Sequence, residues 1–467
     1  MRQITTKPEL LYYVITYFAI MILVGAYFSK KIKSSDDYAL AGRSLGPIVL
    51  MGTLMATSVG SGTVTGGGNS LAYNYGYWAG VMWIVPYLVV CPTYYFIYKI
   101  IRKTGCYTVP QILGNTYGHE TKLLGSIINL IGLAGIISYQ YRGLGFVLNI
   151  TTGIPVETAT IVSAAVVIVI SIFGGLFSVA YTDALGAFII VFCCLIGLPF
   201  VIEAGGGWEK ITAAVDPVKL TFTGGRQWFT IIGGYLPLII LLLGDQNFYQ
   251  RISAAKSDSI ARNSTIGWAV LTNLAIPCVA IIAFTGLSMF GSNIQAGMAF
   301  MSMTTVVPTV IGGLLLAAAS AFIVTTGTSY LLSSATSITY DFYVTYINKQ
   351  PTDKQTLTVT RWATPIIGVV AYVILQFFPT ILAVQNWSYT MIGASITPVV
   401  LGALLWKKVT RIAGFLSMFV GVSATLIWEL LKLPGGVASA LIAFPAAVIV
   451  LIAATLVTQP RNSGVAD

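Results

Sequence analysis

The sequence predicts an all-α integral membrane protein, and its composition and the lengths of its apolar runs support this class. Hydrophobic residues make up 56% of the chain, charged residues only 9%, and the mean hydropathy is +0.84. A soluble domain carries about 25% charged residues. The apolar residues fall into runs near the roughly 20 residues that a helix needs to cross a bilayer. We therefore expect residues 1–467 to form one helical domain surrounded by lipid.

Thirteen transmembrane helices are predicted, and each is close to the length of one bilayer crossing. The first apolar run is long enough to span and shows no small-residue cleavage site, so no cleavable signal is expected. The expected spans are residues 10–29, 48–72, 78–101, 124–148, 155–173, 180–202, 228–249, 264–290, 308–340, 359–378, 381–405, 412–433 and 437–457.

The basic residues are distributed unevenly between the connections. If connections alternate between the two sides, one side holds 18 of the 25 lysines and arginines and the other holds six. The positive-inside rule then places the N-terminus outside and the C-terminus in the cytoplasm. The net charge of +10 is explained by this topology, so no nucleic-acid partner is expected. Arg142 is left over, within the span at 124–148.

The span at 48–72 contains an unusual density of glycine. Gly60, Gly62 and Gly66–Gly68 stand within nine residues, and each costs a helix about 1 kcal/mol relative to alanine. Irregular backbone at membrane depth requires protein or a wet cavity to satisfy it. We expect the helix to unwind here and to free the carbonyls of Ala56 and Val59 for a cation. The alternative is close helix packing through small residues.

The span at 228–249 ends in a similar break. Gly244 is followed by Asp245, Gln246 and Asn247, three strongly polar residues. Each broken span opens a block of five, at residues 48–202 and 228–405, with a leading helix at 10–29 and trailing helices at 412–457. Two blocks of five with a broken first helix are typical of inverted-repeat carriers.

A cluster of hydroxyls in the span at 308–340 indicates a cation site. Thr325, Thr328 and Ser329 stand at i, i+3 and i+4 and share one helix face, with Thr326 beside them. Hard cations prefer oxygen ligands, and Asp183 from another apolar segment would supply one negative charge. The alternative is that these hydroxyls bond back to their own helix or join helices together.

Charged residues within membrane spans are candidates for function. Arg142 would need an anion, either an acidic side chain or a substrate carboxylate, which a guanidinium grips bidentately. The alternatives are that Arg142 pairs with Asp183 or Asp245, or extends outward. Arg251 and Asp341 are expected at the membrane interface.

Three stretches resemble the sodium:solute symporter family. They are the loop Ser35–Arg43, the run from Gly174-Gly175 to Thr182-Asp183, and the turn Gln250-Arg251 with Ala255-Lys256-Ser257. The resemblance covers about residues 10–433. It implies a LeuT-type five-plus-five inverted repeat with flanking helices, and sodium-driven cotransport by alternating access.

The resemblance also implies one or two sodium sites. The common site would use the carbonyls of Ala56, Val59 and Phe322 and the hydroxyls of Thr325 and Thr326. A second site, present in some relatives, would use Asp183, Thr325, Thr328 and Ser329. Thr stands at two positions where relatives often have Ser, and Phe322 stands where a small residue is usual.

The expected solute site lies between the two breaks. Met82-Trp83 stands where sugar carriers have a polar residue, and Ser58 and Asp245 replace the tryptophans that cage choline. Arg142 favours a carboxylate and Asp245 an amino group, so an organic anion or a zwitterion is expected. The residues expected to line the site are Ser58, Ser61, Thr63, Trp83, Tyr139, Arg142, Asp245, Gln246 and Asn247.

Other classes of function fit the sequence less well. A sugar, a choline-like solute or proton coupling are the alternatives within carriers, and a channel would show a repeated pore loop. An enzyme would need a catalytic cluster, which a single histidine (His119) and five scattered cysteines do not supply. The expected location is the inner membrane of a bacterium, as a monomer or a loose homo-oligomer.

Overall fold

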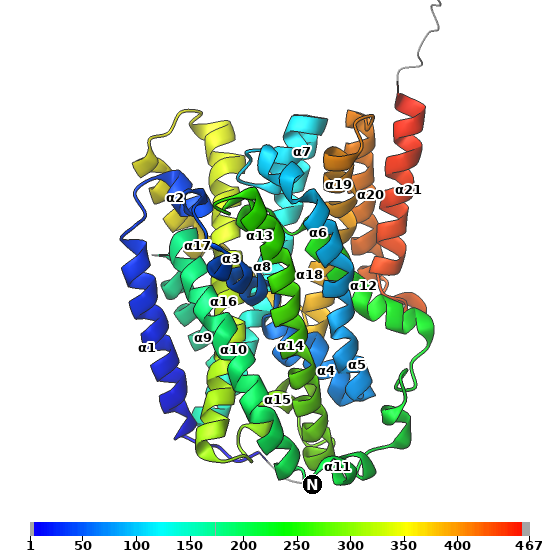
Figure 1. The fold of residues 1–467 in the computed structure, drawn as a ribbon. Coiled ribbons are helices and arrows are strands. Elements are labelled where there is room, and N and C mark those ends of the chain that lie inside the picture. Colours follow the sequence, from blue (N-terminus) through cyan, green and yellow to red (C-terminus); the bar gives the residue numbers. More distant parts are fainter. Residues whose placement is uncertain (1–3, 173, 460–467) are drawn as a thin grey trace, which may run out of the picture.

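The computed structural model describes residues 4–172 and 174–459, and these form a bundle of helices (Figure 1). The first half contains α1 (Leu10–Ser29), α2 (Ser35–Leu40), α3 (Pro47–Ser58), η2 (Gly62–Gly66), α4 (Gly67–Tyr75), α5 (Tyr77–Val81), η3 (Met82–Ile84), α6 (Val85–Lys103), α7 (Val109–Tyr117), α8 (His119–Thr152), α9 (Val156–Ile172) and α10 (Leu176–Ala204).

The second half has the same all-helical character. It contains α11 (Trp208–Ala213), α12 (Trp228–Gly244), α13 (Gln246–Ser253), α14 (Asp258–Phe290), α15 (Ala299–Met303), α16 (Thr309–Ser337), η6 (Ile338–Ile347), α17 (Asp353–Leu375), α18 (Ile381–Ser395), α19 (Thr397–Leu405), α20 (Arg411–Leu430) and α21 (Ala440–Thr458).

The membrane-spanning character of the bundle is confirmed. Within the described residues, 11 helical segments are long and apolar enough to cross a bilayer, and the bent pair α3 with η2–α4 makes a twelfth. Helix α9 has 17 residues and is slightly shorter. These elements correspond to the thirteen predicted spans, so the predicted number is roughly consistent with the structure.

The break predicted in the span at 48–72 is present. Helix α3 ends at Ser58, and the two parts of the span meet at an angle of 49°. Val59 has φ −118° and ψ 84°, outside the helical region, so its carbonyl no longer continues the helix. The chain then forms a wide π-type turn, η2, before α4 begins at Gly67.

A second break separates α12 from α13. Asp245 is extended, with φ −71° and ψ 116°, and its side chain accepts a hydrogen bond from the backbone N–H of Asn247. This is the usual role of an aspartate before the first turn of a helix. The polar run that follows Gly244 therefore starts a new helix.

Helix α16 occupies the centre of the bundle. Of its apolar stretch 83% is buried within the protein, compared with 22% for α1 and 28% for α21. Figure 1 shows α1 and α21 at opposite edges of the bundle. The two peripheral helices therefore present most of their apolar surface to lipid, whereas the hydroxyls of α16 face other helices.

Candidate ion and solute site

The break in the first span packs against the middle of α16, and polar atoms from both meet there. The hydroxyls of Thr325 and Thr326 donate hydrogen bonds to the carbonyl of Ala56, at 3.2 and 2.8 Å. A Cβ on Gly60 would lie 2.5 Å from the Thr326 hydroxyl, so only glycine allows this approach. Three of the five atoms predicted for the common sodium site are therefore in direct contact.

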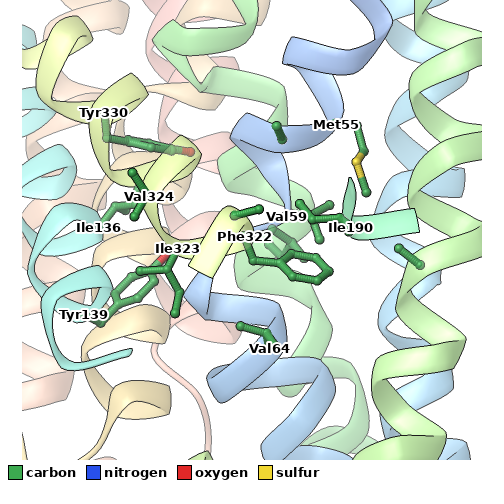
Figure 2. Packing of buried hydrophobic residues seen from close by; sticks show 14 of the residues in the cluster. Met55, Val59, Val64, Ile136, Tyr139, Ile190, Phe322, Ile323, Val324 and Tyr330 are labelled. Carbon is green, nitrogen blue, oxygen red and sulfur yellow. The ribbon is translucent and has the colours of Figure 1, made fainter. Parts of the chain in front are cut away.

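The remaining two predicted ligands of this site are backbone carbonyls. Val59 and Phe322 are both buried, and Figure 2 shows the Phe322 ring directed toward the part of the core that holds Val59 and Ile190. The large side chain at position 322 therefore fills the core, and the predicted role needs only its carbonyl.

A buried ion pair lies one turn further along α16. Arg251 on α13 donates to Asp183 on α10 through Nη2 at 3.2 Å, and both side chains are 0% exposed. Ser329 on α16 donates to the same carboxylate oxygen at 3.0 Å, and Thr53 on α3 does so at 2.7 Å. Four helices therefore converge on one carboxylate.

The structure brings together part of the predicted second sodium site. Asp183 and Ser329 are in contact, whereas Thr328 donates to Val324 and Thr325 carbonyls within its own helix. Among the described residues, the Oδ1 atom of Asp183 has no hydrogen-bond partner. A buried carboxylate oxygen without a donor is a suitable ligand for a cation.

The structure shows that Arg251 and Asp341, which were expected at the membrane interface, are covered by protein. Arg251 is fully buried, and Asp341 is 1% exposed. Arg251 is buried because Asp183 neutralises it and because Thr53, Ser329 and Asn247 accept its remaining N–H groups. A buried guanidinium needs this degree of pairing, since an unpaired charge in the interior is costly.

The first break also contacts a set of aromatic side chains. Tyr87 donates to the Ser58 carbonyl at 3.0 Å, and the indole N–H of Trp268 donates to the Ser58 hydroxyl at 2.9 Å. The Tyr139 and Tyr389 hydroxyls are 3.0 Å apart. These hydroxyls and rings therefore gather around the first break.

Two buried side chains with unpartnered N–H groups pack against the glycine-rich segment. Within the described part of the chain, neither Trp83 Nε1 nor Gln385 Nε2 has a hydrogen-bond partner, although both side chains are buried. A Cβ on Gly67 would lie 2.3 Å from the Trp83 ring, and the Gly67 N–H donates to Gln385 Oε1 at 3.2 Å. The Trp83 ring and the Gln385 side chain therefore both pack against the glycine-rich segment, and Gln385 Nε2 lies closest to Gly62.

The polar residues of the second break are bound to α16 and α8. Asp245 accepts from the Tyr330 hydroxyl at 2.6 Å, and Asn247 accepts from Ser333 at 2.7 Å. Gln246 accepts from Asn129 at 2.9 Å. These contacts hold α13 against the centre of the bundle.

The structure places the remaining predicted solute residues in different surroundings. Ser61 bonds to Thr65 at 2.6 Å and to the Tyr139 carbonyl at 3.2 Å, and Thr63 is buried in η2. Arg142 donates to the carbonyls of Phe378 and Pro379, at 3.1 and 3.3 Å, and pairs with neither Asp183 nor Asp245.

Arg142 also lines a cavity of about 420 Å³ at the end of the bundle that holds the loop after α17. Thr65 and Gln295 line the same cavity. The guanidinium therefore shares this cavity with Thr65 of the glycine-rich segment, and it lies about one turn along α8 from Tyr139.

Several residues of this region were not predicted from the sequence. They are Thr53, Tyr87, Arg251, Trp268, Tyr330, Gln385 and Tyr389. Two signals pointed to some of them: Tyr87 follows Trp83 by four residues, and Tyr389 follows Gln385 by four. An i, i+4 pair lies on one helix face, so each pair could have been placed together.

The fold and the two helix breaks define the class of protein. The structure is similar to that of a Na⁺-coupled sialic acid symporter in its substrate-bound outward-open state, with a TM-score of 0.81 at 17% identity, covering 97% of this chain and 98% of that one. It is also similar to MhsT in complex with L-phenylalanine, with a TM-score of 0.58 at 14% identity, covering 88% and 99%. The fold is that of the LeuT-type secondary transporters.

The sequence identifies the family. The sequence model of the sodium:solute symporter family matches residues 38–421. The chain belongs to this family, so it is a multi-pass membrane transporter rather than an enzyme.

Two relatives illustrate the similarity. The high-affinity proline transporter PutP of Bacillus subtilis (strain 168) is 28% identical over 484 residues, covering 96% of this chain and 98% of the relative. The sodium/proline symporter of Escherichia coli (strain K12) is 25% identical over 452 residues, covering 88% and 85%.

Proposed function

We propose that the protein couples the entry of sodium to the uptake of a small zwitterionic solute, with proline as the first candidate. The contact that carries the ion part of the proposal is the meeting of Thr325, Thr326 and Ala56 at the first helix break. Sodium that binds there would join the broken span to α16. The bound ion would thereby stabilise the conformation that receives the solute.

The unpartnered N–H groups of Trp83 and Gln385 support a solute with a carboxylate. Trp83 Nε1 and Gln385 Nε2 are buried without acceptors, and each buried unsatisfied donor costs about 1–3 kcal/mol. A carboxylate that reached either N–H group would supply its missing acceptor. Asp245, buried at the second break, would pair with the ammonium group. Proline carries both groups, and the relatives named above are proline transporters.

Arg142 would contact the solute before the solute reaches the site between the two helix breaks. Its position in the cavity that it shares with Thr65 and Gln295 favours a role in attracting the anionic end of the solute from the outside. The role of the other predicted residues, Ser58, Ser61, Thr63 and Tyr139, would be to shape the inner site between the breaks. Gln246 and Asn247 would hold α13 in place.

The orientation that we propose places the N-terminus outside and the C-terminus in the cytoplasm of a bacterial cell. The excess of basic connections supports this. Sodium would then enter from outside with its gradient and with the membrane potential, which contributes about 2.3 kcal/mol per charge per 100 mV. We propose one or two coupled sodium ions, because Asp183 already has Arg251 as a counter-ion and also has a free oxygen.

The test is thermal denaturation of the detergent-solubilised protein in sodium chloride and in potassium chloride. Proline, another amino acid, a hexose, sialic acid and choline would each be added. A ligand at about 100 times its Kd adds roughly 2.7 kcal/mol. We expect sodium to raise the midpoint and proline to raise it further only with sodium. Identical curves in the two salts would exclude a sodium site, and stabilisation by a different solute would exclude proline.

A further inference from the structure

Helix α16 carries polar side chains at every fourth residue from the cation site to its end. Residues four apart are neighbours on a helix surface, so each of these side chains lies beside the next, and the row winds part of the way around the helix. All of them are buried, and the α-helical part, residues 325–337 of α16, extends over roughly 18 Å. We call this set the oxygen column, and its members are Thr325, Ser329, Ser333, Ser337 and Asp341.

Further oxygens face the middle of the oxygen column. Ser333 donates to the side-chain oxygens of Asn247 and Gln250, at 2.7 and 2.5 Å. Ser337 donates to Gln246 Oε1 at 3.0 Å and accepts from Asn129 at 3.2 Å. Amide oxygens of α13 therefore continue the polar lining opposite the hydroxyls of α16.

The C-terminal end of the oxygen column carries an acidic side chain. Asp341 lies in η6, a π-helical segment (Ile338–Ile347) that extends α16. Its Oδ1 accepts from Thr108, the capping residue of α7, at 2.7 Å. Lys122, whose Nζ donates to Thr345 at 2.7 Å, is the cation that acts electrostatically on Asp341.

Unsatisfied polar atoms recur along the oxygen column, and they are an independent sign of a ligand. Among the described residues, Asp183 Oδ1, Asn129 Oδ1 and Asp341 Oδ2 are buried without hydrogen-bond partners. Buried polar groups in proteins almost always have partners. Three unpaired buried oxygens that are distributed along the oxygen column are suited to a cation that passes along it.

We propose that sodium moves between its site at the helix break and the cytoplasm along the oxygen column, and that Asp341 holds the ion at the C-terminal end of the column. This inference rests on the sodium-coupled function proposed above. A sodium ion that leaves its site needs oxygens to replace its hydration shell, because a bare charge in the protein interior is costly. The oxygen column supplies such oxygens once per helical turn.

The route begins beside Arg251. Its guanidinium holds Asp183 and Ser329, and it also donates to the side-chain oxygen of Asn247 at 3.1 Å. The bond to Asn247 would keep Arg251 paired when its contact with Ser329 is released. The ion could then pass Ser329 without leaving a buried unpaired guanidinium behind.

The experiment measures the entry of silver, a thiol-reactive monovalent cation close to sodium in size. The five native cysteines are replaced, and Ser333→Cys or Ser337→Cys is introduced singly into the full chain. Inside-out vesicles in potassium nitrate receive silver nitrate from the cytoplasmic side. The protein is then denatured, and the remaining thiol is counted with a labelled maleimide.

Thr336→Cys is the matched control. Thr336 is equally buried and adjacent to Ser337, but its hydroxyl donates to the Leu332 carbonyl of its own helix. We expect thiols at 333 and 337 to react about tenfold faster than at 336, and sodium nitrate to slow them. Asp341→Asn in the Ser337→Cys background should slow the reaction about tenfold, because a charge that attracts the cation is lost.

Equal rates at 336 and 337 would overturn the proposed route, as would a rate that Asp341→Asn leaves unchanged. Both measurements are made without sodium. They are therefore independent of the proposed symport, which fails instead if sodium does not shift the denaturation curve of the same protein. A route confirmed by silver in a protein without sodium stabilisation would point to a different coupling cation.

Discussion

At the scale of single residues, the hydroxyl of Thr325 is the most direct test of the cation site. Thr325→Ala removes one oxygen that contacts the Ala56 carbonyl. We expect the sodium concentration for half-maximal uptake to rise on the order of tenfold, which corresponds to about 1.4 kcal/mol. The measurement is radiolabelled proline uptake into proteoliposomes as a function of external sodium.

Two further variants control this prediction. Thr325→Ser keeps the oxygen and should keep the sodium requirement. Thr336→Ala removes a hydroxyl that bonds only within α16 and should leave the requirement unchanged. A wild-type sodium dependence in Thr325→Ala would exclude Thr325 from the site.

The ion pair of Arg251 and Asp183 allows a second prediction at this scale. Arg251→Gln leaves a buried carboxylate without its counter-charge, and such a loss costs about 3–5 kcal/mol. We expect the denaturation midpoint in detergent to fall by several degrees. Asp258→Asn, which breaks the half-exposed pair of Arg102 and Asp258, should change it little, because an exposed pair contributes about 0–1 kcal/mol. Similar losses in both variants would contradict this account.

The residues of the site show where sequence reasoning succeeds and where it ends. The shared face of Thr325 and Ser329 follows from helix periodicity and is present. The pairing of Arg251 with Asp183 joins positions 68 residues apart, and nothing in the local pattern of either segment specifies the partner. The same spacing of four that identified Thr325 and Ser329 continues to Ser333 and Ser337, so this extension was available in the sequence.

At the scale of elements, the contact between the first break and α16 depends on the absence of a side chain at Gly60. A Cβ there would lie within 2.8 Å of three Thr326 atoms. We therefore expect Gly60→Ala to separate the two elements and to raise the sodium requirement more than Thr325→Ala does. Sodium-dependent uptake in proteoliposomes measures this.

Gly234→Ala is the control for Gly60→Ala, since a Cβ at Gly234 meets nothing within 4 Å. It should be neutral or slightly stabilising, because alanine favours a helix over glycine. The double variant Gly60→Ala with Thr326→Ser removes the Thr326 methyl and should recover part of the loss. A Gly60→Ala protein with normal sodium dependence would show that the break and α16 do not share the ion.

The elements were largely predictable because long apolar runs and clusters of glycine are strong local signals. Both breaks were expected, at Gly60–Gly68 and after Gly244, and both are present. The short helices α2 and α7 were not expected. Each lies in a connection and starts at a capping residue, Ser34 or Thr108, so its six or nine residues carry too little periodicity to stand out.

At the scale of the whole molecule, the proposed orientation in the membrane predicts which connections face each side. We expect Gln350→Cys to react with an impermeant thiol reagent from the cytoplasm only, and Ser292→Cys from outside only, in a background without native cysteines. Both positions are exposed, in connections at opposite ends of α16. The reverse labelling pattern would contradict the orientation and would also reverse the direction of the proposed sodium route.

The hydrogen bonds of α16 hydroxyls to their own helix have a consequence for biosynthesis. Although it holds much of the polar site, the span that includes α16 has a hydropathy of 2.0, as apolar as α1. Several of its hydroxyls donate to carbonyls one turn earlier, including those of Thr325, Thr328 and Thr336, and a lone helix can satisfy its Ser and Thr side chains in the same way. The nascent segment can therefore enter the bilayer from the translocon as an ordinary span. Thr336 keeps this backbone bond in the assembled bundle, whereas Ser329, Ser333 and Ser337 bond to other helices.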